Sequence, residues 1–162
     1  MSHWARILTK VLLKKDFGIE WDIPNSHLTP GLTGRINYLN WIHEVLHLIT
    51  TAQEDLPYSQ GGIDIGTGAS CIYPLLGYAL YGWSFDATDI DQKSVNASRR
   101  LVTLNKLEDF IRVHQRSSLQ PLLTDLVTTP ISFSMCNPPF FSTMDEVRKL
   151  FSFQSFPSDI LD

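Results

Sequence analysis

The hydrophobic positions in the first third of the chain recur with a helical period. Two stretches show it, residues 4–15 and 35–49. Their apolar positions are Trp4, Ile7, Leu8, Val11 and Leu12 in the first, and Tyr38, Trp41, Ile42, Val45, Leu46 and Ile49 in the second. Each set falls on one side of a helix, so both stretches are expected to be amphipathic helices. Residues 20–34 between them contain prolines and glycines, which predicts an ordered loop wrapped around something.

From Gly61 onward the pattern changes to short apolar runs that alternate with helical stretches. Strands are expected from Gly62 into a glycine-rich turn, at 83–89, at 110–114 and from 131 to 137. Asp91 has the position of a helix N-cap, and a short helix is expected around 119–127. Alternating strands and helices favour a parallel sheet with right-handed crossovers. The predicted fold class is therefore α/β and Rossmann-like. The predicted division is an N-terminal helical and loop extension (1–60), a Rossmann-like core (61–141) and a tail (142–162).

Four polar or glycine positions fall where the predicted strands end, namely Gly66, Asp89, Ser117 and Asn137. Ligands of parallel sheets bind beyond the carboxyl ends of the strands, so these positions predict a shared site. The turn that contains Gly66 and Gly68 lets the backbone approach a ligand closely. Asp64 just before it is suited to an ammonium group or to fixing the loop. Cys71 stands where dinucleotide sites have a third glycine, which disfavours NAD, and no Gly-Lys-Ser/Thr sequence follows for a P-loop.

The last predicted strand runs into Asn137-Pro138-Pro139-Phe140. Proline cannot continue a central strand, so the chain must turn at a rigid corner. An Asn side-chain oxygen and the next carbonyl can both accept hydrogen bonds from an exocyclic amino group and so orient its lone pair. The four residues resemble the catalytic signature of amino-group methyltransferases that use S-adenosylmethionine. A strand followed by a Pro-Pro turn with buried aromatics explains them about equally well when they are taken alone.

Composition limits the remaining possibilities. With 162 residues and two cysteines, the chain is expected to form one domain in a reducing compartment. It contains no apolar run of membrane-spanning length. The formal net charge of -4 gives no overall attraction to nucleic acid, so any RNA contact must come from a local patch. Arg6, Lys10, Lys14 and Lys15 form the candidate patch, and an ordinary solvated helix face is at least as good an interpretation.

The second helical stretch contains His43-Glu44-Val45-Leu46-His47, which fits the HExxH pattern of zinc metalloproteases. No later segment offers an evident third ligand. Two histidines on an amphipathic helix are the favoured interpretation, and no metal is expected.

Four longer runs carry a closer resemblance. They are residues 16–24, 35–41, 62–75 and 136–141. Together they resemble the methyltransferase-like protein 16 family, RNA adenosine-N6 methyltransferases of spliceosomal small nuclear RNA and of a methionine adenosyltransferase messenger hairpin, which are related to a bacterial ribosomal RNA enzyme. The resemblance implies S-adenosylmethionine as cofactor, a structured RNA substrate, and a nuclear location with the cytoplasm as a second one.

The resemblance also implies roles for individual residues. Arg35 would hold the methionine carboxylate, and Gly66, Gly68 and Ser70 would surround the methionine part. Asp89 would bind the ribose and Ser117 would lie near the adenine. Residues 137–140 would receive a flipped adenosine. Lys10, Lys14 and Lys15 would contact the RNA.

The chain departs from the family pattern after the Asn-Pro-Pro-Phe corner. A complete fold of this type continues through three further strands, and residues 142–162 do not resemble them. The sheet is therefore expected to be incomplete on its C-terminal side, with apolar surface exposed at one edge. Two alternatives stay open at this point. One is a truncated product that binds cofactor or RNA without turnover, and the other is a protein-glutamine methyltransferase, which shares the Asn-Pro-Pro corner.

Overall fold

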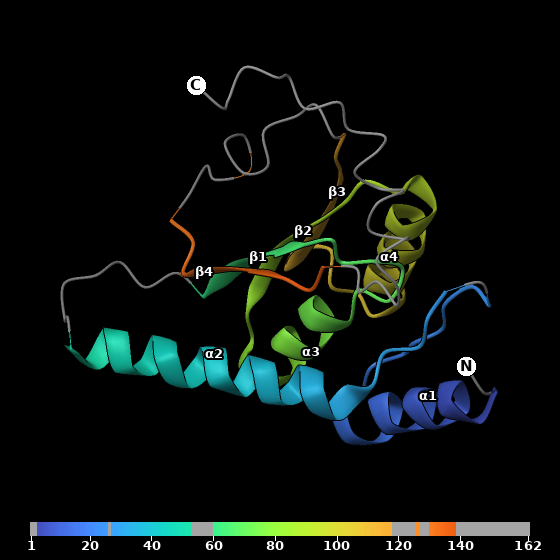
Figure 1. The fold of residues 1–162 in the computed structure, drawn as a ribbon, viewed down its shortest axis with the longest axis horizontal. Helices are drawn as coiled ribbons and strands as arrows, with labels where there is room; N and C mark the ends of the chain where they lie inside the picture. The colour runs from blue at the N-terminus through green and yellow to red at the C-terminus, as the bar shows by residue number, and fades with distance from the viewer. Residues whose placement is uncertain (1–2, 26, 53–59, 118–125, 127–129, 139–162) are drawn as a thin grey trace, which may run out of the picture.

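The computed structural model describes residues 3–25, 27–52, 60–117, 126 and 130–138. Its helices and strands, in chain order, are α1 (His3–Phe17), α2 (Leu32–Ala52), β1 (Gly61–Ile65), α3 (Ile72–Tyr81), β2 (Ser84–Asp89), α4 (Gln92–Leu104), β3 (Ile111–Gln115) and β4 (Phe133–Cys136) (Figure 1). Both N-terminal helices were predicted, and each is longer at both ends than its apolar pattern indicated. The helix expected at 119–127, apart from Leu126, and the tail at 142–162 lie outside the described residues.

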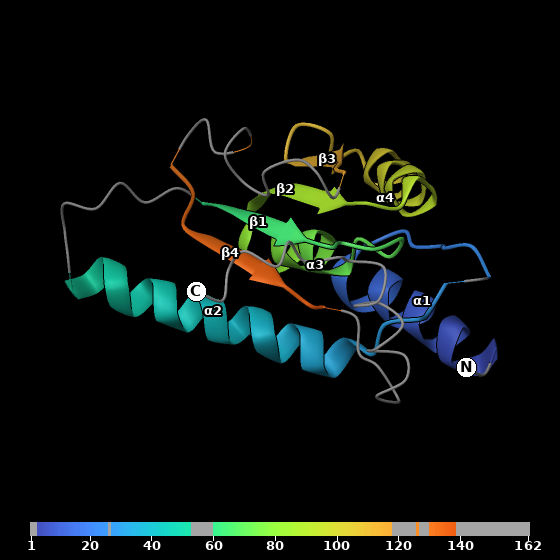
Figure 2. The same ribbon diagram turned by 45° about the horizontal axis from the view of Figure 1, so that its top comes forward.

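The four strands form one parallel sheet in the order β3-β2-β1-β4 (Figure 2). Asp64 of β1 lies opposite Ala87 of β2 on one side and Met135 of β4 on the other. Phe85 of β2 lies opposite Ile111 of β3. The predicted parallel sheet is therefore confirmed, and the carboxyl ends of all four strands point to one edge.

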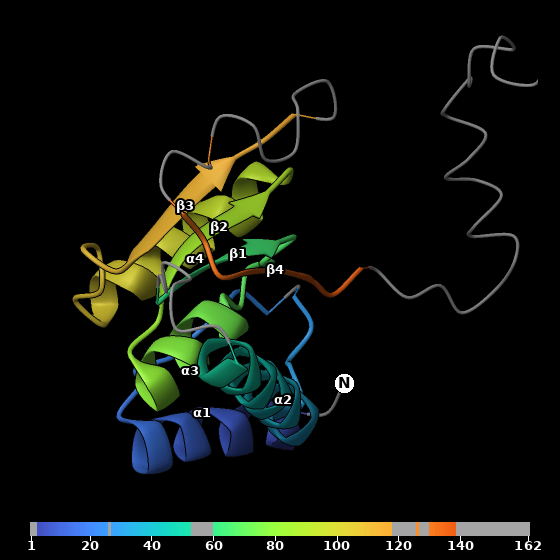
Figure 3. The same ribbon diagram turned by 90° about the vertical axis from the view of Figure 1, so that its left-hand side faces the viewer.

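One hydrophobic cluster joins the helices to one face of this sheet. It includes Leu13 of α1, Leu39 of α2, Leu75 of α3 and Leu101 of α4, together with Phe85 of β2. Figure 3 shows α1, α2 and α3 on the same side of the sheet. The described part of the N-terminal extension thus shares its core with the sheet. No helix within the described ranges combines the length and apolarity that a bilayer span requires.

Helix α4 begins where the sequence placed its cap. The Asp91 carboxylate accepts hydrogen bonds from the backbone N–H and the hydroxyl of Ser94, both at 2.9 Å. These bonds satisfy a free amide of the first turn. They also hold the pKa of Asp91 below its ordinary value, chiefly through the Ser94 N–H.

The apolar face of α1 is not buried in the way its pattern indicated. Trp4 is 76% exposed and Leu8 is 58% exposed, whereas the buried residues of this helix are Thr9 and Leu13. The arc with Leu13 also contains Arg6, whose guanidinium donates to the Asp22 carboxylate at 3.0 Å and to the Ile23 carbonyl. Because these partners lie far away in the sequence, the rotation of α1 about its axis could not follow from hydrophobic spacing alone.

Strand β4 lies at the edge of the described sheet and pairs with β1. Its exposed side chains are Ser134 and Cys136, while Met135 is buried and Phe133 is half-buried. The edge position was predicted. The prediction of exposed apolar surface at this edge is wrong for the side chains of β4. Phe133 and Met135 face the helices, and the small residues Ser134 and Cys136 face away from them.

Gly77 is a position where α3 packs against Phe85 of the sheet with no room for a side chain. A Cβ atom added there would lie 2.6 Å from Cε2 of Phe85. An alanine at an unobstructed helical position usually stabilises by about 1 kcal/mol relative to glycine. At Gly77 we expect the reverse, a loss of about 1–3 kcal/mol in the free energy of unfolding, because the core must be overpacked.

Urea unfolding of Gly77→Ala measures this loss. Gly34→Ala in α2 is the matched control, since nothing lies within 4 Å of its added Cβ. We expect that variant to be as stable as the unchanged chain or more stable. If both alanine variants gained stability, the close packing of α3 on β2 would be contradicted.

Candidate functional site

The glycine-rich turn between β1 and α3 is held by the end of β2. Gly66 and Gly68 have positive φ angles of 75° and 64°, a region that only glycine adopts without strain. The amides of Gly66 and Thr67 both donate to the Thr88 carbonyl at 2.9 Å. The turn therefore needs glycine for its backbone conformation, and two of its amides hold the turn on the sheet rather than pointing to a ligand.

Asp89 fastens the same turn from the carboxyl end of β2. One carboxylate oxygen accepts from the Gly68 amide at 2.8 Å and the other from the Asp91 amide at 2.9 Å. A carboxylate offers about four lone-pair positions, so acceptors remain for a hydroxyl pair. The ribose contact predicted for Asp89 stays a prediction, and a role in positioning the turn is added to it.

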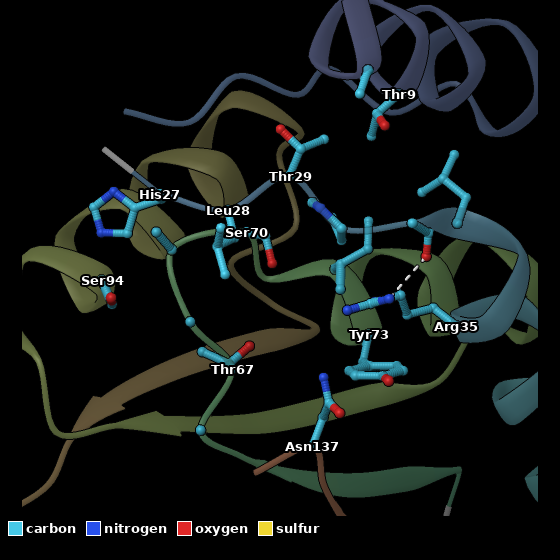
Figure 4. Close-up of a pocket in the computed structure, with 18 of the residues that line it drawn as sticks. Thr9, His27, Leu28, Thr29, Arg35, Thr67, Ser70, Tyr73, Ser94 and Asn137 are labelled. Atoms are coloured by element: carbon cyan, nitrogen blue, oxygen red, sulfur yellow. Dashed lines mark hydrogen bonds between the residues drawn. The ribbon is translucent and has the colours of Figure 1, made fainter. Parts of the chain in front are cut away.

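A cavity of about 940 Å³ opens beside the turn. Its walls come from α1, from residues 27–33, from the first turn of α2, from the glycine turn and α3, from Ser94 at the start of α4, and from the corner after β4 (Figure 4). Six of the predicted site residues line it: Arg35, Gly66, Gly68, Ser70, Asn137 and Pro138. The predicted loop at 20–34 thus does wrap a site.

Of the other residues predicted for catalysis or cofactor binding, three do not line the cavity and two lie outside the described residues. Asp64 and Asp89 do not line the cavity, although Asp89 binds the Gly68 amide in its wall. Ser117 is exposed two residues beyond the end of β3 and does not line it either. Pro139 and Phe140 lie outside the described residues. The roles proposed for all of these residues stay predictions.

Arg35 places an incompletely paired cation in the cavity wall. Its Nη1 donates to the Gly31 carbonyl at 3.2 Å, while its buried Nε has no hydrogen-bond partner among the described residues. Beside it lies Tyr73, which is 8% exposed (Figure 4). Burial raises the pKa of the Tyr73 hydroxyl, and the Arg35 charge opposes that shift. A guanidinium with a spare donor fits the carboxylate of an amino-acid group, so this part of the wall suits the methionine end of the implied cofactor.

Asp64 lies beneath the glycine turn and is 1% exposed. Burial raises the pKa of its carboxyl to about 7, with a smaller contribution from the Asp89 charge. The Thr67 side chain lies near enough to oppose this shift, yet Thr67 Oγ1 and Asp64 Oδ2 lack hydrogen-bond partners within the described residues. Since Asp64 does not line the cavity, its position favours the predicted role of fixing the loop over direct contact with an ammonium group.

Two of the three α1 lysines predicted to bind RNA already face carboxylates. Lys14 pairs with Glu20, and Lys10 Nζ lies 4.0 Å from Asp22 Oδ1. Lys15 is exposed. Exposed pairs of this kind contribute about 0–1 kcal/mol, so they leave these lysines able to exchange partners. Contact with RNA stays a prediction for all three.

The two histidines of the HExxH pattern contact an aromatic ring and two threonine hydroxyls. The ring of His43 stacks on Tyr81 with centroids 4.1 Å apart, and the His47 carbonyl accepts from the Thr50 and Thr51 hydroxyls. Within the described ranges, no three His, Cys, Asp or Glu side chains are grouped as metal ligands.

The family model for RNA methyltransferases matches residues 3–154 of this chain. The chain belongs to this RNA methyltransferase family. Among its relatives is the RNA N(6)-adenosine-methyltransferase METTL16 of Mus musculus, 42% identical over 147 residues, which are 89% of this chain and 26% of the mouse protein. Ribosomal RNA large subunit methyltransferase F of Pseudomonas savastanoi pv. phaseolicola is 37% identical over 148 residues, 90% of this chain and 45% of that protein. The chain thus spans about a quarter to a half of these relatives.

Solved structures of the RNA methyltransferase family share the fold. The N-terminal domain of human METTL16 in complex with SAH has a TM-score of 0.72 at 36% identity, covering 92% of this chain and 60% of that one. The human METTL16 catalytic domain in complex with MAT2A 3'UTR hairpin 1 has a TM-score of 0.75 at 38% identity, covering 94% of this chain and 51% of that one. The chain therefore corresponds to part of the Rossmann-like methyltransferase domain seen in these structures.

Sequence reasoning missed the role of Trp21, which does not line the cavity but bonds to a residue in its wall. The indole N–H of Trp21 donates to the Ser70 carbonyl at 3.1 Å, and Trp21 is 1% exposed. It ties the loop after α1 to the glycine turn. A tryptophan within a proline-containing loop was the available signal, but its partner lies 49 residues away.

We expect Trp21→Phe to reduce the affinity for S-adenosylhomocysteine several-fold and to lower the free energy of unfolding by about 1–3 kcal/mol. The hydrogen bond to Ser70 is lost and its carbonyl is left unpaired. Trp83→Phe is the control, because Trp83 is equally buried but packs on the rings of Tyr81, Phe85 and Phe133 away from the glycine turn. Calorimetry on both folded variants should show reduced affinity for Trp21→Phe alone. Equal affinities would contradict the positioning role.

Proposed function

We propose that this chain carries the cofactor site and the catalytic corner of an S-adenosylmethionine-dependent methyltransferase that acts on N6 of adenosine in structured RNA. The observation that supports this most is the meeting of Arg35, Ser70 and Asn137 on one cavity at the carboxyl edge of a parallel sheet. The METTL16 relatives named above, the bound SAH and the bound RNA hairpin in their structures support the same reaction class. A small-nuclear-RNA substrate and a nuclear location are the finer parts of the proposal.

The cavity can hold a cofactor and a base together. Small-molecule sites usually have volumes of roughly 300–1,000 Å³, and this one lies near the upper end at about 940 Å³. S-adenosylmethionine, when bound, supplies an electrophilic methyl group. Arg35 would hold its carboxylate through its guanidinium, which lies in the cavity wall, and the backbone around Gly66 and Gly68 gives close access because neither glycine has a side chain.

The corner after β4 would orient the acceptor. Asn137 directly follows β4 and its amide group points into the cavity (Figure 4). Its side-chain oxygen and the Pro138 carbonyl would accept the two hydrogens of the adenine amino group. This fixes the direction of the nitrogen lone pair without a strong base, so alignment supplies most of the acceleration.

The alternative is a product that binds cofactor or RNA without turnover. Both functions can be tested on the chain as it stands. Calorimetry with S-adenosylhomocysteine measures binding, and transfer of a labelled methyl group to an RNA hairpin with an unpaired adenosine measures turnover.

We expect binding of S-adenosylhomocysteine together with transfer, and N6-methyladenosine after digestion of the RNA to nucleosides. Binding without transfer would favour the inactive alternative. If the labelled methyl group appeared on glutamine of a protein and not in the RNA, the protein-glutamine methyltransferase would be favoured. Absence of S-adenosylhomocysteine binding by the folded chain would contradict the proposed cofactor site.

A further inference from the structure

Three cations from two helices converge on one exposed carboxylate. Arg6 Nη2 lies 3.0 Å from Asp22 Oδ1, Lys10 Nζ lies 4.0 Å from the same oxygen, and Arg100 Nη2 lies 3.7 Å from Asp22 Oδ2. Arg100 Nη2 also donates to the Asp22 carbonyl at 2.7 Å. We call Arg6, Lys10, Asp22 and Arg100 the Asp22 cluster. It joins α1, the loop after α1, and α4.

The Asp22 cluster has a surplus of two positive charges, because one carboxylate faces three cations. The whole chain carries a formal charge of -4, so this surplus is local. Its members differ in exposure. The side chain of Arg6 is 20% exposed, whereas those of Lys10 and Arg100 are 55% and 60% exposed. Arg6 also donates to the Ile23 carbonyl, so Arg6 anchors the loop while Lys10 and Arg100 remain accessible to a ligand.

The helices that carry the Asp22 cluster also form walls of the cavity. Leu8, Thr9 and Leu12 of α1 line it, and so does Ser94 of α4. A nucleotide whose base enters this cavity brings its own phosphates to the surface around it. Phosphates bind best where cations are in excess and partly free.

We propose that the Asp22 cluster is a contact site for RNA phosphates, in which Lys10 and Arg100 bind the phosphates and Asp22 weakens the interaction. This inference rests on the proposed function and adds Arg100 and Asp22, which the sequence did not assign to RNA. The exposed pairs with Asp22 are worth about 0–1 kcal/mol each, so a phosphate can replace the carboxylate at small cost. Asp22 then leaves a negative charge beside the RNA backbone, which opposes binding.

The test compares opposite changes within the Asp22 cluster. Fluorescence anisotropy with a labelled RNA hairpin that has an unpaired adenosine gives the dissociation constant at several salt concentrations. Each phosphate contact contributes about 0.9 to the slope of log affinity against log salt, which is about eightfold between 0.1 M and 1 M salt. Arg100→Gln and Lys10→Gln should therefore each weaken binding about eightfold near 0.1 M salt, relative to the effect at 1 M, and reduce the slope by about 0.9. Asp22→Asn should tighten binding, by about threefold to fivefold.

Arg112→Gln is the control, because Arg112 is an exposed cation on β3. The residues before and after it along the strand, Ile111 and Val113, face the helices, so Arg112 points to the other face of the sheet. Binding of S-adenosylhomocysteine should stay within about twofold in every variant, which shows that the cavity is intact. Thermal unfolding should show how far Asp22→Asn affects the fold.

The outcomes distinguish failure of the Asp22 cluster from failure of the proposed function. If Arg100→Gln, Lys10→Gln and Asp22→Asn all bind RNA as the unchanged chain does, the Asp22 cluster is not an RNA site and the proposed function stands. If Asp22→Asn weakens RNA binding, Asp22 is an anchor of the loop and its opposing role is overturned. If the unchanged chain binds S-adenosylhomocysteine but not the hairpin, the RNA substrate and the Asp22 cluster are both overturned while the cofactor site is kept.

Discussion

Replacing Asn137 by alanine is expected to lower the rate of methyl transfer about a thousandfold, while the dissociation constant for S-adenosylhomocysteine changes by less than about twofold. The amide of Asn137 lies in the cavity wall, across from Arg35 and the glycine turn (Figure 4). Its proposed partner is the amino group of the base and not the cofactor. Losing it should therefore abolish orientation of the acceptor and leave cofactor binding largely intact.

Ser134→Ala is the matched control for Asn137→Ala. Ser134 lies in β4, three residues before Asn137, and its side chain is exposed. Its removal should change neither the transfer rate nor the binding of S-adenosylhomocysteine. Single-turnover transfer and calorimetry measure the two quantities separately. If Asn137→Ala lost cofactor binding and transfer to the same degree, the role assigned to Asn137 in holding the base would be wrong.

The sheet and its carboxyl edge could be predicted because they depend on short-range signals. Gly61 to Gly66 gives a buried strand that ends at glycine, and Asp91 supplies a cap in the right place before α4. Such signals can be interpreted from residues close together in the sequence, together with the rule that parallel strands are connected through helices. The shared position of Gly66, Asp89 and Asn137 at one edge follows from that topology.

The parts that could not be predicted depend on partners far apart in the sequence. Trp4 of α1 is exposed and Thr9 is buried because of where Asp22 and the sheet lie. The helical period of the sequence gives no information about those positions. The bond between Trp21 and Ser70 closes a loop of 49 residues. Likewise, the residues that line the cavity from α1 carry no motif, because apolar helix positions look the same whether they face a core or a ligand.

Asp64 should make the stability of the folded chain depend on pH in an unusual direction. Its carboxyl has an ordinary pKa of 3.8 and a pKa of about 7 in the folded chain, because burial penalises the charged form. The folded state therefore holds the proton more tightly than the unfolded state. The contribution of Asp64 to stability is fully present below pH 4 and is lost as the pH rises through about 7. A shift of this size corresponds to roughly 4 kcal/mol.

Asp64→Asn should remove this dependence, because the amide is neutral at every pH and has nearly the same shape. We expect the variant to gain stability relative to the unchanged chain as the pH rises from 4 to 8, by up to roughly 4 kcal/mol in the free energy of unfolding. Urea unfolding at several pH values measures the difference between the two proteins and cancels the other titrating groups. Asp109→Asn, at an exposed carboxylate, should show no such trend. Parallel stability profiles for Asp64→Asn and the unchanged chain would mean that Asp64 is charged in the folded state, and a hydrogen-bonded or ion-paired carboxylate would then have to hold the glycine turn.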